Sequence, residues 1–535
     1  MSISNSRSKW LLAAMVATYC VLGVLYALET PKWQTPDEPA HFNYTQFVAQ
    51  SGRLPVLHVG DYPAQYLEEI KAARFPEAMS VSSIRYESHQ PPLYYAWAAL
   101  LYDATIGLPF DLQFLILRLF SVALGALLLL AAYRLVSTLF PGEELLALGA
   151  TGFIALVPMH LALTAAVNND TLAELLLMLL LWQCALMVRE GADARRTVCI
   201  GVLLGLALLT KTTIYLPAIG TALATVWLCA SPQPPEVAEN GDQDLQGLWQ
   251  DAKQLPGGRA VFALSSVQHT KAGFRNIALV LAVALLLAGP WFARNALVYG
   301  GMDLLAWKRH ELVVAGQLRA AERLAQLGLP ALIREFVLTT FRSFWAQFGW
   351  MGVLVDQCIY LGLALFSVLV ALGFALFVQG VIRRAIPQVP GSYSRLEPWQ
   401  AVGSALLALS AFLTVVTYVG YNLGFWQPQG RYLFTALGPL SVGFALALRE
   451  LLRPKTARRL AMGLLPVGLL LLGYGLWRRD VPKWSLALWA SAVAWLGAAA
   501  WLPTRWRWLP PVLLSGAFVA LNLVCVSAFV VPYLS

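Results

Sequence analysis

Residues 10–28 read WLLAAMVATYCVLGVLYAL and are followed at 29–32 by Glu-Thr-Pro-Lys. An uninterrupted apolar run of about 20 residues is long enough to cross a hydrocarbon core of about 30 Å as a helix. A cleavable signal would have a shorter apolar core and small residues at its end. The run therefore predicts an uncleaved first transmembrane helix, with Arg7 and Lys9 on the cytoplasmic side.

The composition of the whole chain agrees with this membrane assignment. Of 535 residues, 58% are hydrophobic and 13% are charged, against about 45–50% and about 25% in soluble domains. These values exclude a soluble cytoplasmic enzyme, a secreted disulfide scaffold and a disordered protein. The six cysteines lie in or beside apolar runs, as small buried hydrophobes do. The net charge of +9 is spread over short loops, so we expect no nucleic-acid partner.

Twelve further apolar runs predict an all-α, polytopic transmembrane bundle of about thirteen spans. The expected division is 1–28, first span; 29–111, external loop with an acidic motif and juxtamembrane helices; 112–231, transmembrane helices; 232–274, cytoplasmic linker; 275–293, transmembrane helix; 294–350, external segment; 351–450, transmembrane helices with a Gln-Gly-Arg-Tyr motif; and 451–535, C-terminal transmembrane helices. This count puts the most basic loops in the cytoplasm. Residues 91–106 are apolar but short, and we expect an interfacial helix there; if they cross the membrane, every later loop changes side.

The first polar motif, TPDEPAHF at 35–42, follows the first span directly. Proline on each side of Asp37 and Glu38 stiffens the backbone and fixes where the carboxylates point. The structural alternative is that either acid caps the next helix. Juxtamembrane acids more often mark reaction or ion sites. Such a carboxylate can take a proton from a hydroxyl or hold a divalent cation, and the sequence leaves the metal question open.

Two more external motifs contain candidate binding residues. ESHQPPLYY at 87–95 ends the same loop, and its His89 could act as acid, base or ligand, or simply be solvated at a helix start. Asn168-Asn169-Asp170 lies between two spans, also on the outer side. Asn and Asp before an apolar helix are the preferred caps, and a capping Asp170 beside Asn169 can still contact substrate.

Basic residues form the fourth external group. The turn Gln427-Pro428-Gln429-Gly430-Arg431-Tyr432 places an arginine where the positive-inside pattern needs none. Arg431, with Gln429 and Tyr432 beside it, is therefore expected to bind a ligand, because a guanidinium grips phosphate oxygens. Gly430 would let the backbone approach that ligand closely. Lys211 and Arg294 are further candidates, although a lysine at an interface can also be a snorkelling anchor.

Other polar and aromatic residues have simpler explanations. Arg118 and Glu174 lie inside spans and are expected to face the bundle interior, where they could pair with each other. The aromatic cluster at 344–350, FWAQFGW, is predicted to be an interfacial belt. His160 is expected to be a helix-packing residue.

Together the motifs resemble those of the GT-C superfamily of membrane glycosyltransferases, which use polyprenyl-phosphate sugars. The strings TPDEPAHF, ESHQPPLYY, RNALVYG, FWAQFGW and QGRYLF are closest to a bacterial family of multi-spanning membrane proteins of unassigned function, over about residues 10–450. The resemblance implies Asp37 as catalytic base, with Glu38 as second candidate. It also implies donor-phosphate contacts by Arg431, with Lys211 and Arg294.

On this basis we expect a transferase that moves a sugar from a polyprenyl-phosphate donor to a hydroxyl of a lipid, glycan or protein acceptor. Its location would be the bacterial cytoplasmic membrane, with the active site on the periplasmic or outer face. No cofactor is required, although a divalent cation could take part. The alternatives are a transporter or flippase of lipid-linked saccharides, or an oligosaccharide ligase or polymerase. Discontinuous helices and an inverted repeat would favour a transporter.

Overall fold

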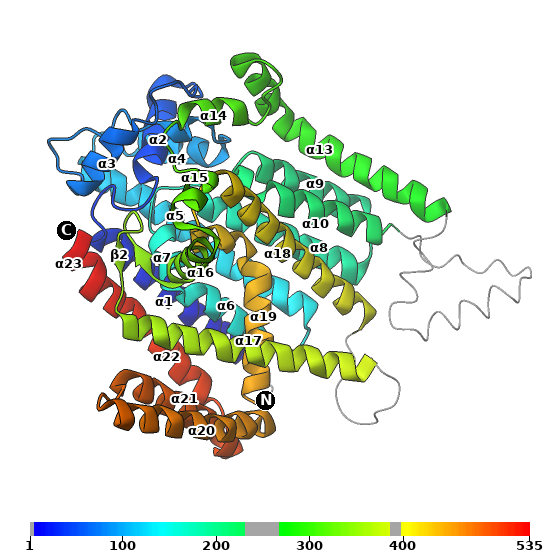
Figure 1. The fold of residues 1–535 in the computed structure, drawn as a ribbon. Helices are drawn as coiled ribbons and strands as arrows, with labels where there is room; N and C mark the ends of the chain where they lie inside the picture. Colours follow the sequence, from blue (N-terminus) through cyan, green and yellow to red (C-terminus); the bar gives the residue numbers. More distant parts are fainter. Residues whose placement is uncertain (1–4, 231–266, 386–396, 535) are drawn as a thin grey trace, which may run out of the picture.

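The computed structural model describes residues 5–230, 267–385 and 397–534, and it is helical apart from one small hairpin within those ranges (Figure 1). The hairpin pairs β1 (Gln347–Phe348) with β2 (Val353–Leu354) in antiparallel register. The predicted all-α transmembrane bundle is confirmed. The flexible linker predicted at 232–274 lies outside the described residues up to 266. From Val267 onward the prediction is wrong, because these residues already form helix α13.

Ten helical segments among the described residues are long and apolar enough to cross a membrane, or up to 12 if each of two bent pairs is one span. The exact count of thirteen is therefore not confirmed. Two predicted spans, α9 and α10, are only 15 and 14 residues long. The principal helices are α1 (Asn5–Glu29), α5 (Phe110–Leu139), α6 (Glu144–Leu156), α7 (Pro158–Thr164), α8 (Asp170–Glu190), α9 (Ala194–Leu208), α10 (Tyr215–Leu228), α13 (Val267–Tyr299), α17 (Gln357–Ala385), α18 (Pro398–Gly424), α19 (Leu437–Leu451), α20 (Pro454–Arg478), α21 (Lys483–Trp501), α22 (Leu509–Val524) and α23 (Val531–Leu534).

Prolines mark the points where helix α1 ends, where α2 begins and where α6 gives way to α7. Helix α1 ends at Glu29, just before Pro31, and α2 (Glu38–Ser51) begins with Pro39 in its first turn. Proline lacks the N–H that a helix interior needs but fits a first turn, where that N–H has no partner. The break between α6 and α7 also falls at a proline, Pro158, and bends the pair by 66°.

The first long loop, predicted to be external and called the external loop below, is built from short helices over the ends of the spans. They are α2, α3 (Ala64–Ala72), the 3-10 helix η1 (Tyr86–His89) and α4 (Leu93–Ala104). The segment 91–106, whose crossing of the membrane was ambiguous in the sequence, contains helix α4. At about 1.5 Å per residue its 12 residues are too short to cross the hydrocarbon core. It packs against α2 and α5.

The second external segment begins later than predicted, because α13 continues to Tyr299. It contains α14 (Trp307–Val313), α15 (Ala320–Leu327), α16 (Leu329–Trp345) and the hairpin. The interfacial belt predicted at 344–350 is wrong for its central residues: Trp345, Ala346 and Phe348 are buried in the main core. The Trp345 ring packs against the ring of Phe366 on α17.

The main core joins α1, α5–α8 and the ends of α16 and α19, whereas the C-terminal helices α20 and α21 lie at the periphery (Figure 1). An apolar cavity of about 440 Å³ lies between α17, α19, α21 and α22. None of the polar motifs lines this cavity. The external loop, the α7–α8 turn and the start of α19 instead meet at a separate polar cluster, which is described next.

Candidate active site

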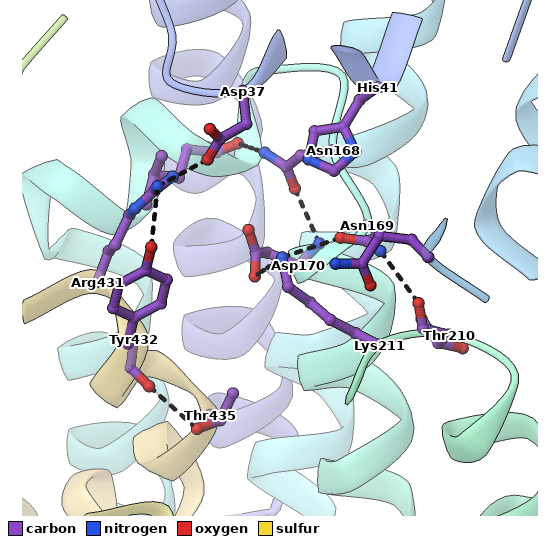
Figure 2. A network of polar contacts seen from close by, with 12 residues as sticks. Asp37, His41, Asn168, Asn169, Asp170, Thr210, Lys211, Arg431, Tyr432 and Thr435 are labelled. Carbon is purple, nitrogen blue, oxygen red and sulfur yellow. Dashed lines mark hydrogen bonds and ion pairs between the residues drawn. The ribbon is translucent and has the colours of Figure 1, made fainter. Parts of the chain in front are cut away.

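Asp37 stands at the start of α2 and makes two strong contacts. Its Oδ2 accepts a hydrogen bond from Arg431 Nη2 at 2.7 Å (Figure 2). Its Oδ1 accepts one from the Tyr86 hydroxyl at 2.7 Å. The side chain of Arg431 is 7% exposed and that of Asp37 is 25% exposed. The carboxylate is therefore the more accessible partner of the pair. Residues 394 positions apart thus meet in one ion pair.

The backbone of Asp37 is also unusual. Its φ of 67° lies in the left-handed region, which non-glycine residues adopt at a cost and for which Asn and Asp are enriched. The surrounding structure must therefore hold the residue in place, and its immediate neighbour Glu38 does so.

Glu38 points away from Asp37 into the protein. Its side chain is fully buried and accepts two hydrogen bonds from Arg118, to Oε1 at 2.9 Å and to Oε2 at 2.7 Å. The backbone N–H groups of Trp33 and Val167 donate to the same carboxylate. Glu38 therefore ties the first external loop to the α7–α8 turn. As second catalytic candidate it is placed poorly, because no part of it is exposed to a substrate.

A second ion pair lies beside the first. Lys211 Nζ is 2.7 Å from Asp170 Oδ1 and donates to Asn169 Oδ1 at 2.9 Å, while Asn169 Nδ2 donates to the carbonyl of Thr210 (Figure 2). The side chain of Lys211 is 10% exposed and that of Asp170 is 26% exposed. Asn168 Oδ1 accepts from the N–H of Asp170. The capping contact at this turn is thus made by Asn168, which leaves the Asp170 carboxylate for Lys211.

The Gln-Gly-Arg-Tyr turn forms the 3-10 helix η3 (Gly430–Ala436) directly before α19. Gln429 Oε1 accepts from Arg431 Nε at 2.6 Å, and the Tyr432 hydroxyl donates to Gln427 Oε1 at 2.8 Å. The expectation that Gly430 approaches a ligand is not what the structure shows. A Cβ there would lie 2.1 Å from the Thr340 carbonyl oxygen, so the glycine allows η3 to pack against α16.

Two predicted residues lie outside this cluster. Arg294 donates to the backbone carbonyls of Leu54 and Pro55 and so holds the external loop onto α13. His89 is hydrogen-bonded through Nδ1 to the Tyr86 carbonyl at 2.9 Å, and its ring lies 4.5 Å from that of His310 on α14. Burial lowers the pKa of His89 to about 4, so it is neutral near pH 7.

The predicted pairing of Arg118 with Glu174 is wrong. Arg118 binds Glu38, and Glu174 binds His160, whose Nε2 lies 2.8 Å from Glu174 Oε2. Both pairs are buried inside the bundle. The packing role expected for His160 therefore includes a polar contact that its sequence neighbourhood did not reveal.

Sequence reasoning missed His41, Tyr86 and Glu87 as neighbours of Asp37. His41 lies four residues after Asp37, one helical turn away, and its Nδ1 is 2.7 Å from the Tyr95 hydroxyl. Burial lowers the pKa of His41 and raises the pKa of Glu87. Both positions stand inside the quoted motifs. Helical spacing could have identified His41, whereas Glu87 and Tyr86 depend on a loop conformation.

The electrostatics of Asp37 follow from these contacts. Burial alone would raise its pKa, but the charge of Arg431, followed by His41 and the Tyr86 hydrogen bond, lowers the pKa to about 2. Asp37 is therefore ionised at neutral pH. In the part of the chain that the structure describes, no group of three or more His, Cys, Asp or Glu residues is arranged to hold a metal ion.

Residues 90–239 match the family model described as dolichyl-phosphate-mannose-protein mannosyltransferase. This confirms the predicted resemblance to GT-C membrane glycosyltransferases. The matched segment includes Asp170 and Lys211, whereas Asp37 and Arg431 lie outside it. No curated protein matches the sequence.

Solved structures of low sequence identity also align with the chain. ArnT from Cupriavidus metallidurans, bound to undecaprenyl phosphate, aligns with a TM-score of 0.49 and 14% identity over 99% of this chain and 77% of its own. The Archaeoglobus fulgidus oligosaccharyltransferase tethered to an acceptor peptide aligns with a TM-score of 0.44 and 15% identity over 96% of this chain. The present chain spans only 55% of that enzyme.

Proposed function

We propose that this protein is an integral membrane glycosyltransferase that moves a sugar from a polyprenyl-phosphate donor to a hydroxyl of a lipid, glycan or protein acceptor. The observation that carries the proposal is the cluster in which the Asp37–Arg431 and Asp170–Lys211 pairs stand side by side (Figure 2). Two cations and two carboxylates are the groups that such a transfer needs, and the mannosyltransferase match supports the same chemistry.

The cations would bind the donor phosphate. Arg431 offers a planar set of donors that fits phosphate oxygens, and Lys211 adds a point charge. Their side chains are 7% and 10% exposed, so they act in surroundings less polar than water and their attraction for an anion is strengthened. A phosphate that binds Arg431 competes with Asp37 for the guanidinium.

The carboxylate of Asp37 would take the proton of the acceptor. The hydroxyl oxygen attacks C1 of the sugar, the bond from C1 to the phosphate oxygen breaks, and the phosphate leaves with the bonding electrons toward Arg431 and Lys211. The hydroxyl proton passes to Asp37. Because Arg431 is the strongest influence that lowers the pKa of Asp37, a phosphate that draws Arg431 away makes Asp37 a stronger base at the moment it is needed.

The proposal has no cofactor. The two cations neutralise the leaving phosphate, and a divalent cation at Asp37 remains the alternative if transfer stops on chelation and returns with Mg²⁺. We place the protein in the bacterial cytoplasmic membrane with the cluster on the periplasmic face, as the basic loops indicate.

The test is the variant Asp37→Asn in purified protein reconstituted with defined polyprenyl-phosphate sugars and a membrane extract as acceptor. We expect product, measured by mass spectrometry, to fall by about 10²–10⁴-fold, the usual contribution of a positioned base. Donor binding should persist, because the competing charge has been removed from Arg431.

Glu335→Gln is the matched control, since Glu335 also pairs with an arginine, Arg323, but outside the cluster. It should leave transfer unchanged. Transfer at the wild-type rate by Asp37→Asn would refute the role of Asp37. Movement of the lipid-linked sugar across the bilayer without any new glycosidic bond would identify a flippase instead.

A further inference from the structure

The buried pair of His160 and Glu174 takes no part in the proposed chemistry, yet it lies directly beneath the site. The two side chains are 1% and 6% exposed, and Nε2 of the histidine is 2.8 Å from Oε2 of the glutamate. Ionisable groups inside transmembrane bundles are costly and usually functional. Replacing such a pair by apolar residues is often neutral for stability, so stability alone does not explain it.

Glu174 belongs to the same helix face as Asp170. The two residues are four apart on α8, and residues so spaced lie one above the other, about 6 Å apart along the axis. Glu174 is therefore one turn deeper in the bundle than the carboxylate that holds Lys211. Any shift of this turn of α8 moves Asp170 with it.

The other partner reaches the element that carries Arg431. The ring of His160, on α7, meets the ring of Phe434 at a centroid distance of 5.3 Å and an interplanar angle of 86°. Phe434 is buried and lies three residues after Arg431 in η3. Side chains at i and i+3 in a 3-10 helix eclipse each other. Phe434 is thus one turn below Arg431, just as Glu174 is one turn below Asp170.

We propose that His160 and Glu174 are positioning residues that set the spacing between Asp170 and Arg431, and so between the two cations that receive the donor phosphate. The pair links α8 through α7 to η3. The distance between α8 and η3 at the level of this pair keeps Lys211 and Arg431 at the separation that one phosphate can bridge. The activity readout of this inference rests on the proposed function, whereas its folding and lipid-binding readouts do not.

The test uses the double variant His160→Leu/Glu174→Leu. Removing one partner alone leaves an uncompensated polar or charged group in the bundle and lowers the melting temperature. Removing both restores most of that loss. We nevertheless expect the double variant to bind undecaprenyl phosphate about tenfold more weakly and to raise KM for the donor by a similar factor, with KM for the acceptor unchanged.

Tyr19→Phe is the matched control. The Tyr19 hydroxyl donates to Thr164 Oγ1, on the same helix α7, at 2.9 Å and is equally buried, but this hydrogen bond joins α1 to α7 and makes no link to α8 or η3. This variant should keep wild-type lipid binding, which separates a general loosening of α7 from a change of spacing. The conservative variant His160→Gln, which can still donate to Glu174, should recover donor binding at least in part.

Wild-type affinity for undecaprenyl phosphate in the folded double variant would overturn the positioning role. Weakened binding in Tyr19→Phe of the same size would also overturn it. If wild-type protein makes no product while the double variant still weakens lipid-phosphate binding, the proposed transferase activity fails and the positioning role stands.

Discussion

At the scale of single residues, the cluster shows how one carboxylate is kept ionised while remaining reachable. Asp37 is held by Arg431 and Tyr86, and its side chain retains a quarter of its exposure. The adjacent Glu38 is also an acid, but its two carboxylate oxygens already accept hydrogen bonds from Arg118 and from backbone N–H groups. Two neighbouring acids thus have different environments, and the environment decides which one can act.

The hydroxyl of Tyr86 gives a pH test of this environment. The variant Tyr86→Phe removes a hydrogen bond that favours the ionised form, so the pKa of Asp37 rises above its value of about 2. Because the base form is required, activity is lost as pH falls through that pKa. The acid limb of kcat/KM should therefore move to higher pH in the variant, measured from about pH 3 to 7 in liposomes.

A second tyrosine of the external loop serves as the control for this shift. The Tyr66 hydroxyl donates to the Ser80 carbonyl, away from the cluster, and Tyr66→Phe should leave the acid limb in place. An unchanged limb in Tyr86→Phe would mean that Asp37 does not control the rate-determining protonation.

The motifs predicted much of this site because chemistry and chain order were both visible in the sequence. Asp37, Asp170, Lys211 and Arg431 all follow or precede apolar runs on the same predicted side, and the structure brings them together. The roles of adjacent residues could not be separated in that way. Glu38 is distinguished from Asp37 by contacts with Arg118, 80 positions away, and with the backbone of Val167, 129 positions away.

At the scale of elements, the spacing of apolar runs predicted the spans but not their junctions. The break at Pro158 has a local signal in its proline, but its angle of 66° and the contact between α16 and η3 could not be predicted from the apolar pattern. Gly430 illustrates this limit, because the sequence shows a glycine before an arginine but not that the Thr340 carbonyl of another helix occupies the space of its side chain. The arrangement of η3 is therefore set by α16 as much as by its own residues.

Arg118, on α5, holds one of these junctions together. It donates to Glu38 and to the carbonyls of Ala27 and Thr30 at the end of α1, and thereby joins α5, α1 and the start of α2. Removing one partner of such a buried pair costs about 3–5 kcal/mol because the remaining charge is uncompensated. We expect Glu38→Gln to lower the melting temperature of the detergent-solubilised protein clearly.

The variant Glu335→Gln provides the scale for that measurement, because its ion pair with Arg323 is partly exposed and should contribute less than the buried pair of Glu38 and Arg118. Below its melting temperature, the folded Glu38→Gln variant should still transfer sugar, because Glu38 supports the loop and does not touch substrate. Full stability with complete loss of turnover would instead make Glu38 a catalytic residue.

At the scale of the whole molecule, the apolar runs of the sequence predict an odd number of crossings before each motif, which would put all the motifs on one side of the membrane. The contacts among Asp37, Asp170, Lys211 and Arg431 require the ends of α1, α8, α9 and α19 that carry them to lie at one membrane surface. The short helix α4 does not disturb this parity, because it cannot cross. From the charge bias of the loops we propose that this common surface is the outer one.

This orientation can be measured with single cysteines. Ser82, in the external loop, and Asp193, between α8 and α9, are both exposed and lie at opposite ends of the bundle by the order of spans. Ser82→Cys should react with a membrane-impermeant maleimide in cells with a permeabilised outer membrane, and Asp193→Cys only after lysis. The native cysteines are half-buried or buried within helices or at their ends, so the unsubstituted protein sets a low background. Labelling in the reverse order would place the cluster in the cytoplasm, where a phosphate-linked lipid of the outer leaflet could not reach it.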